Sequence, residues 1–212
     1  MSVPQADRTL DCSGLKYPVP ILQAEQTLAE LFPGQVLEVV STDANTIPDL
    51  ETWAQRIAAD LLLVSPSADG QFRFYVRKGR APAAAGARAS ADNNLFLVVL
   101  RTGLNAPGQV RAAFMYASLA AAMGQDTVVY CVQEGADAAK RDVAEKDVSP
   151  QGGPTISQRI AEALDMGVRI EVCTQTASVR NIKAEDLIPQ AKLIGGASLI
   201  DYAMRTRGSL TF

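Results

Sequence analysis

Histidine is absent from this chain of 212 residues, and its absence excludes several kinds of chemistry. Ser-His-Asp and Cys-His catalysis both require an imidazole, as do most zinc sites and the usual side-chain proton shuttle of neutral solution. General base chemistry therefore falls to aspartate, glutamate, lysine or water.

Cysteine is scarce, and its three positions, Cys12, Cys131 and Cys173, form no Cys-x-x-Cys pair. This spacing excludes a zinc ribbon and a thioredoxin-type dithiol. An odd number of cysteines in a reducing compartment favours free thiols over a disulfide framework. Neither a G-x-G-x-x-G nor a Walker pattern occurs, so we predict no metal and no cofactor.

Long apolar runs are also lacking. Segments such as 95–100 fall well short of the roughly 18 to 20 residues that a membrane span needs, and the N-terminal sequence MSVPQADR has no signal-peptide core. The 20 Lys and Arg against 23 Asp and Glu form no basic stripe. We therefore predict a cytoplasmic protein with no membrane span and no nucleic-acid partner.

The first 79 residues alternate between strand and helix patterns. A short strand begins at Arg8, prolines at the first turn open a helix that runs to about Leu31, and a second strand and helix follow. Two further short strands enclose Ala-Asp-Gly, which is a strong hairpin signal. The pattern predicts an α/β domain over residues 1–79, a two-layer βαβαββ sandwich.

Residues 80–93 are rich in alanine, glycine and proline and contain no large apolar side chain. Such a segment buries little surface, so we predict a flexible linker between two domains, residues 1–79 and 94–212. The two halves share no repeat.

The second half begins with NLFLVVL, an apolar run typical of a strand buried on both faces of a parallel sheet. Strands and helices then alternate, which predicts right-handed crossovers and a mostly parallel α/β sheet with helices on both faces. Expected strands are 94–100, 127–132, 168–173, 192–194 and 210–212, and expected helices are 106–123, 136–145, 156–166, 183–188 and 197–205.

Cys173 is the candidate reactive group, because it ends a predicted strand and is followed by polar, loop-like residues 174–178. Ligands of open α/β sheets bind in the crevice beyond the carboxyl ends of the strands. Loop N–H groups and Arg180 could stabilise a thiolate there. The alternative is a buried cysteine that acts as a small hydrophobic side chain.

Residues 11–20, DCSGLKYPVP, match the D-x-x-G-L-x-C-P-x-P signature of the TusA/SirA sulfur carriers, and residues 33–39 match the turn and strand that follow it. The first domain therefore resembles that family over nearly its whole length. The carrier cysteine of the family aligns with Tyr17, and a phenol cannot hold a persulfide.

The resemblance thus implies a degenerate carrier site made of Tyr17, Pro18, Pro20 and Cys12. Cys12 could replace the lost thiol, although a half-buried strand cysteine needs no function. Our main expectation is a domain that is kept for docking a partner, for scaffolding or for contacts in an oligomer.

The second half resembles the DsrE family of sulfur-transfer proteins. The resemblance lies in residues 120–124, 166–173, 182–187 and 194–197, and it maps the family's conserved cysteine onto Cys173. It implies that Cys173 carries a persulfide, which is anionic at neutral pH.

Arg180, Lys183 and the N–H groups of Gly195 and Gly196 are candidates to stabilise that anion. Arg180 could equally be a solvated loop charge, and the glycine pair could mark a turn with positive φ. Cys131 lies inside an apolar strand. It is either a core residue or an accessory thiol that acts as the resolving cysteine for Cys173.

Three functions remain open. The first is a sulfur-relay, sulfurtransferase-like protein that exchanges persulfide sulfur on Cys173 with donor or acceptor proteins. The second is a non-catalytic binding, regulatory or scaffold protein, and the third is a thiol-dependent reductase or peroxidase. The resemblance also implies a homo-oligomer, a trimer or hexamer, built by the DsrE-like half.

Overall fold

The computed structural model describes residues 3–16, 19–67, 70–79, 94–149 and 153–212. The chain divides into two compact units, residues 1–88 and 89–212. The predicted linker, 80–93, lies outside the described residues, as do Tyr17 and Pro18.

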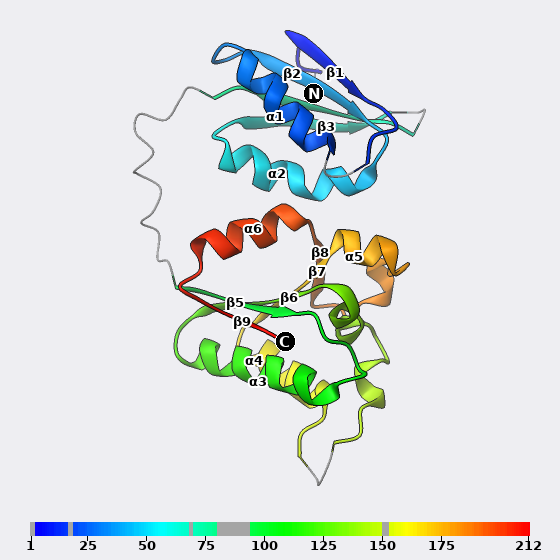
Figure 1. Ribbon diagram of the computed structural model, residues 1–212, viewed down its shortest axis with the longest axis vertical. Helices are drawn as coiled ribbons and strands as arrows, with labels where there is room; N and C mark the ends of the chain where they lie inside the picture. The colour runs from blue at the N-terminus through cyan, green and yellow to red at the C-terminus, as the bar shows by residue number, and fades with distance from the viewer. Residues whose placement is uncertain (1–2, 17–18, 68–69, 80–93, 150–152) are drawn as a thin grey trace. The chain divides into compact units, whose positions relative to one another are not determined.

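The first unit is a four-stranded mixed sheet with two helices (Figure 1). The strands lie in the order β1-β2-β4-β3, with β1 parallel to β2 and with β4 antiparallel to both β2 and β3. Its elements are β1 (Arg8–Cys12), α1 (Val19–Glu30), β2 (Val36–Ser41), α2 (Ile47–Arg56), β3 (Asp60–Pro66) and β4 (Phe72–Arg77).

Alternate residues of this sheet form the core against α1 and α2. Leu37 and Val39 of β2 point to one face because side chains alternate along a strand, and Trp53 of α2 packs in the same buried cluster. The predicted two-layer βαβαββ fold is confirmed.

The second unit is a parallel sheet of five strands in the order β8-β7-β6-β5-β9. Its elements are β5 (Leu95–Leu100), α3 (Pro107–Ala122), β6 (Asp126–Cys131), α4 (Ile156–Asp165), β7 (Arg169–Cys173), α5 (Thr174–Val179), β8 (Ala191–Ile194), α6 (Gly196–Arg205) and β9 (Gly208–Thr211). None of the helices in the described part of the chain combines the length and the apolar character that crossing a membrane requires.

Two buried clusters lie on opposite faces of this sheet. Val98 and Val129 pack on the face that α3 and α4 cover, whereas Leu97 and Tyr130, their neighbours in sequence, face α6 (Figure 1). The apolar run of β5 is therefore buried on both sides, and the predicted parallel sheet with helices on both faces is confirmed.

Three segments differ from the prediction. Residues 174–178, predicted as a loop, lie in α5, because Ala177 packs into the core and tertiary packing outweighs weak helix propensity. Segment 136–145 forms the 3-10 turns η2 (Gln133–Ala139) and η3 (Ala144–Lys146) instead of an α-helix. Segment 183–188 is likewise reduced to the single turn η5 (Ala184–Asp186).

Candidate functional site

Cys173 is the last residue of β7, and its extended backbone (φ −61°, ψ 125°) leads directly into α5. Its side chain is 9% exposed and lies on the α6 face of the sheet. The apolar cluster around it includes Tyr130 of β6 and Leu199 of α6. The thiol is thus at the carboxyl edge of the sheet, as predicted, but under a layer of side chains.

One polar group contacts the sulfur directly. The Cys173 Sγ donates to the side-chain carbonyl Oε1 of Gln175, with 3.4 Å between the two atoms. The amide nitrogen Nε2 of Gln175 and the hydroxyl of Thr174 are buried and have no hydrogen-bond partner among the described residues. The sulfur is therefore surrounded by apolar side chains and contacts the side-chain amide of Gln175.

Cys131 lies at the end of the neighbouring strand but faces the other way. Its register partner on β7 is Val172, so it shares the α3 and α4 face with Val172 while Cys173 points to the opposite face. Cys131 is fully buried, and burial, with a smaller contribution from the charge of Glu171, raises its pKa to about 12. The structure does not bring the two thiols together, and it does not support an accessory role for Cys131.

The two predicted cations are engaged elsewhere. The guanidinium of Arg180 pairs with Asp137 and lies 3.9 Å from Glu134. The Lys183 ammonium pairs with Glu185 at 3.5 Å on an exposed surface. Within the described residues neither cation makes a hydrogen bond or ion pair with Cys173, because carboxylates on adjoining turns compete for them.

The glycine pair does lie beside the thiol's strand end. Ile194 of β8 is the register partner of Cys173, and Gly195 and Gly196 are the next two residues of the chain. The carbonyl of Gly195 accepts a hydrogen bond from Tyr130 Oη at 2.8 Å. Gly195 has a φ of −73°, so the interpretation of a turn that needs positive φ is wrong for it.

In the first unit, Cys12 is a core residue. Its side chain is fully buried at the end of β1, 3.5 Å from Gln23 Oε1, and burial, with a smaller contribution from Asp11, raises its pKa. Pro20 is buried in the first turn of α1. A fully buried thiol with a raised pKa makes a poor substitute for a carrier thiol.

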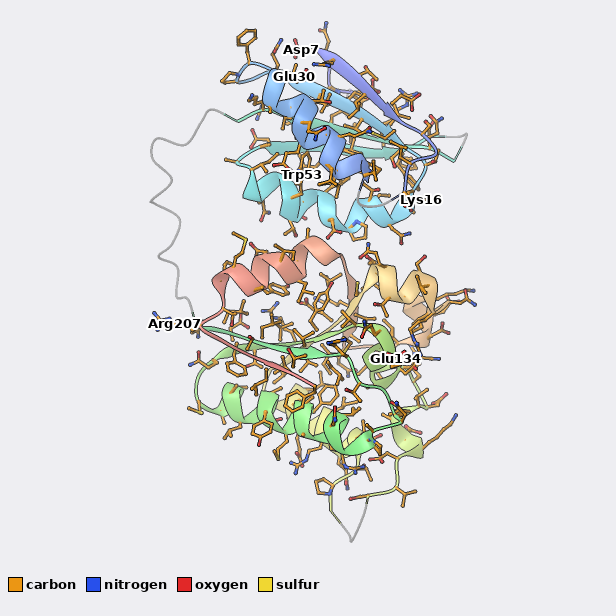
Figure 2. The ribbon with its side chains drawn as sticks, viewed as in Figure 1. Asp7, Lys16, Glu30, Trp53, Glu134 and Arg207 are labelled. Carbon is orange, nitrogen blue, oxygen red and sulfur yellow. The ribbon has the colours of Figure 1, made fainter. Side chains whose placement is uncertain are left out.

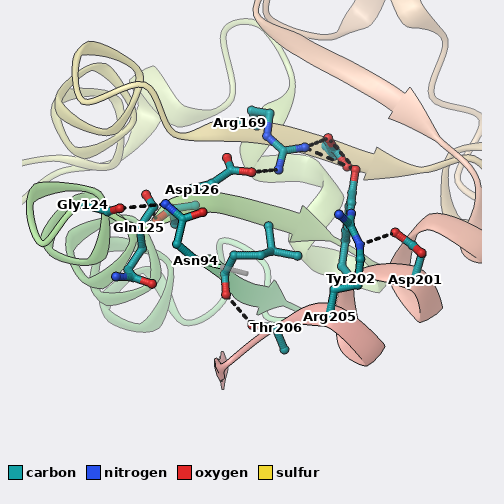
Figure 3. A network of polar contacts seen from close by, with 12 residues as sticks. Asn94, Gly124, Gln125, Asp126, Arg169, Asp201, Tyr202, Arg205 and Thr206 are labelled. Atoms are coloured by element: carbon teal, nitrogen blue, oxygen red, sulfur yellow. Dashed lines mark hydrogen bonds and ion pairs between the residues drawn. The ribbon is translucent and has the colours of Figure 1, made fainter. Parts of the chain in front are cut away.

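A buried polar network that the sequence did not predict lies on the face of the sheet that carries Cys173. Figure 3 shows its members Asp126, Arg169 and Tyr202. Glu171, two residues before Cys173 on β7, is 4% exposed, and its Oε1 accepts from Arg169 and from Tyr202 of α6, both at 3.1 Å. Arg169 also pairs with Asp126 of β6 at 3.0 Å. Burial raises the pKa of Glu171, although Tyr202, Arg169 and Lys192 oppose the shift.

The alternation of Arg169 and Glu171 with apolar residues was the available signal for this network. In a half-exposed strand such alternation indicates a solvent face. Here α6 covers that face, and the charges are paired beneath it instead.

A separate cleft of about 300 Å³ opens at the carboxyl ends of β5 and β6. Its lining includes Arg101, Gln133, Glu134 (labelled in Figure 2) and Phe212, but not Cys173. Gln133 has a φ of 51°, a strained conformation for a residue other than glycine. Arg101 Nε donates to Gln133 Oε1 at 3.2 Å.

Comparison with known proteins assigns both halves. The model of the DsrE/DsrF-like family matches residues 94–212, and the model described as Sulfurtransferase TusA matches residues 8–78. An uncharacterised protein of Methanocaldococcus jannaschii is 24% identical over 198 residues, which cover 93% of this chain and 70% of that protein.

Two further matches each cover part of the chain. The sulfur carrier protein TusA of Allochromatium vinosum is 39% identical over 72 residues, covering 34% of this chain and 93% of that protein. The crystal structure of the E. coli ychN protein matches 55% of this chain and 97% of its own, with 16% identity and a TM-score of 0.47.

Proposed function

Because the chain belongs to the DsrE/DsrF-like family and carries a TusA domain ahead of that half, we propose that it is a sulfur-relay protein that holds persulfide sulfur on Cys173. In this proposal residues 1–79 are the TusA-like domain, 80–93 the linker and 94–212 the DsrE-like domain. A relative of the first domain is named a sulfur carrier.

The proposed step is thiol exchange. The Cys173 thiolate attacks the outer sulfur of a donor persulfide, the donor's S–S bond breaks, and the donor leaves as a thiolate while the outer sulfur stays on Cys173. Attack by an acceptor thiolate on that outer sulfur reverses the roles and releases Cys173. One sulfane sulfur moves, so neither an external oxidant nor a histidine is needed.

The observation that carries the proposal is the environment of Cys173 compared with the other two cysteines. Burial raises the pKa of both Cys12 and Cys131, and a thiol that stays protonated is a poor nucleophile. Cys173 lies at the carboxyl edge of a parallel sheet, and its sulfur is hydrogen-bonded to the side-chain amide of Gln175.

The first domain, in this proposal, docks the sulfur donor or acceptor protein and carries no sulfur itself. The alignment of the carrier cysteine with Tyr17 supports this role, since a phenol cannot form a persulfide. Cys12 supports it too, because its thiol is enclosed in the core.

Incubation with a persulfide donor, followed by intact mass and peptide mapping, tests the proposal. We expect one added sulfur atom on Cys173, removal of that sulfur by an acceptor thiol, and no adduct in Cys173→Ser. The matched variants Cys12→Ser and Cys131→Ser should load as the wild type does. Loading on Cys12 or Cys131 instead, or no loading on a folded wild-type chain, would contradict it.

A binding, regulatory or scaffold protein is the second candidate. The small exposure of Cys173 favours it, because an incidental thiol is usually buried. Absence of any adduct, with normal binding of a partner by the first domain, would establish it. A dithiol reductase or peroxidase has less support, since Cys131 faces the opposite side of the sheet.

We also propose a homo-oligomer, a trimer or hexamer, in the cytoplasm. Its support is α3, which is apolar nearly all round and exposes Tyr116, Leu119 and Met123. A helix of that kind is usually covered. All three cysteines are free, as a reducing compartment would keep them.

A further inference from the structure

The side chain of Gln175 contacts the Cys173 sulfur through its carbonyl oxygen. This orientation suits a protonated thiol, which donates a hydrogen bond. Its Oε1 accepts from the Sγ at 3.4 Å, while its Nε2 is buried without a partner among the described residues. The hydroxyl of Thr174, a residue that is 8% exposed and follows the cysteine directly, is also buried without a partner among the described residues.

Ionisation of the sulfur changes the hydrogen-bonding group that Gln175 must supply from an acceptor to a donor. A thiolate or an anionic persulfide accepts hydrogen bonds, so the carbonyl oxygen that suits the thiol would repel it. The two ends of a glutamine amide differ little in shape, and the torsion that exchanges them has a broad two-fold profile. Rotation of the amide places Nε2 on the sulfur and breaks no bond of Nε2 in the described structure.

The two tyrosine hydroxyls of this layer already donate hydrogen bonds elsewhere. Tyr130 Oη donates to the carbonyls of Ile194 and Gly195, and Glu171 and Tyr202 are bonded to each other. Glu171 lies on β7, the strand of Cys173, and Tyr130 lies on the neighbouring strand β6. Tyr202 lies on α6, which covers this face of the sheet. Gln175 is distinguished by its contact with the sulfur, and its Nε2 donor has no partner in the described part of the chain.

We propose that Gln175 is a catalytic residue that accepts a hydrogen bond from the Cys173 thiol and, by rotation of its amide, donates one to the thiolate and to the persulfide. This inference rests on the proposed sulfur-relay function. It names the group that replaces the predicted cations, because Arg180 and Lys183 are held by carboxylates.

The rate at which iodoacetamide alkylates Cys173 in the full-length chain, followed by peptide mapping across a range of pH, tests the inference. In Gln175→Leu we expect the midpoint of the pH profile to rise by about one unit, which lowers the rate at neutral pH about tenfold, because a charge-assisted hydrogen bond is lost. Gln175→Glu should move the midpoint further, since a carboxylate only accepts. Ser178→Ala, at an exposed position of the same helix, should leave the profile unchanged.

Sulfur loading is scored on the same samples and separates the two proposals. If the wild type takes up no sulfur, the relay function fails, while the alkylation profiles still decide the role of Gln175. If the wild type loads but the Gln175→Leu and Gln175→Glu profiles coincide with its own, the role of Gln175 is overturned alone. Protection of the buried Cys131 from alkylation reports in each digest that the variant is folded.

Discussion

The three thiols of this chain differ in chemistry because their surroundings differ. Cys12 and Cys131 are fully buried in the two cores. The pKa of Cys131, raised to about 12 by burial and by Glu171, leaves about one molecule in ten thousand as the thiolate at pH 8. Since the thiolate is the nucleophile, we expect Cys131 to react slowly although it lies at the same edge of the sheet as Cys173.

Selective alkylation follows from this contrast. With iodoacetamide at pH 8 and a folded chain, we expect Cys173 to be labelled first and Cys12 and Cys131 only after denaturation. Peptide mapping at increasing times measures the order. Simultaneous labelling of Cys131 and Cys173 would show that burial does not protect Cys131.

Among the elements, α6 has the strongest influence on the site. It covers one face of the parallel sheet, and its Tyr202 (Figure 3) donates a hydrogen bond to Glu171. Two guanidinium groups lie near the Tyr202 ring, that of Arg169 at 5.5 Å and that of Arg205 at 5.8 Å from its centroid. A buried carboxylate is thereby held two residues from the candidate thiol.

The buried Glu171 should make stability depend on pH. Its pKa is raised above the usual 4.5, mainly by burial and against the effects of Tyr202, Arg169 and Lys192. Between the unfolded and folded pKa values the native state binds more protons, so the free energy of unfolding falls as the pH rises through that interval. We expect Glu171→Gln to remove this loss, so that wild type loses stability relative to the variant as the pH rises above 4.5.

Urea unfolding at several pH values, followed by far-UV circular dichroism, measures the difference. Trp53, the one tryptophan, lies in the first unit, and its fluorescence identifies that unit's own transition. The control is Glu185→Gln, which removes an exposed carboxylate and should show no such trend. A wild-type curve parallel to that of Glu171→Gln would contradict the prediction.

At the scale of the whole molecule, the two units differ in what they can contribute to sulfur transfer. The first has a core cysteine and two helices on one sheet, whereas the second has the thiol at the edge of a parallel sheet. The second also has an apolar helix surface on α3 that the described residues leave exposed. Assembly through that surface is the prediction that belongs to this scale.

Light scattering of the full-length chain should give the mass of a trimer or hexamer. We expect Leu119→Glu, at a residue 54% exposed in the centre of the α3 stripe, to lower the mass to that of a monomer, because a charge in an apolar interface is costly. Val148→Glu, at a residue 87% exposed outside α3, is the matched control and should not change the mass. A monomeric wild type would reject the oligomer.

Much of the fold is readable from local pattern. Apolar runs and turn residues predicted the order of the strands in both units and of the helices in the first, and the polar residues after Cys173 marked a strand end. The helical α5 was missed because Thr174, Thr176 and Ser178 are weak helix formers whose helix is held by the burial of Ala177.

The site itself depends on contacts between distant residues. A local pattern sets which side chains alternate along a strand, but the register between β6 and β7 turns Cys131 away from Cys173, and the packing of α6 converts an apparently solvated Glu171 into a buried one. The same holds for the carboxylates that engage Arg180. Periodicity is a property of neighbours in sequence, whereas burial, pairing and the direction of a pKa shift arise only where separate segments exclude water from one another.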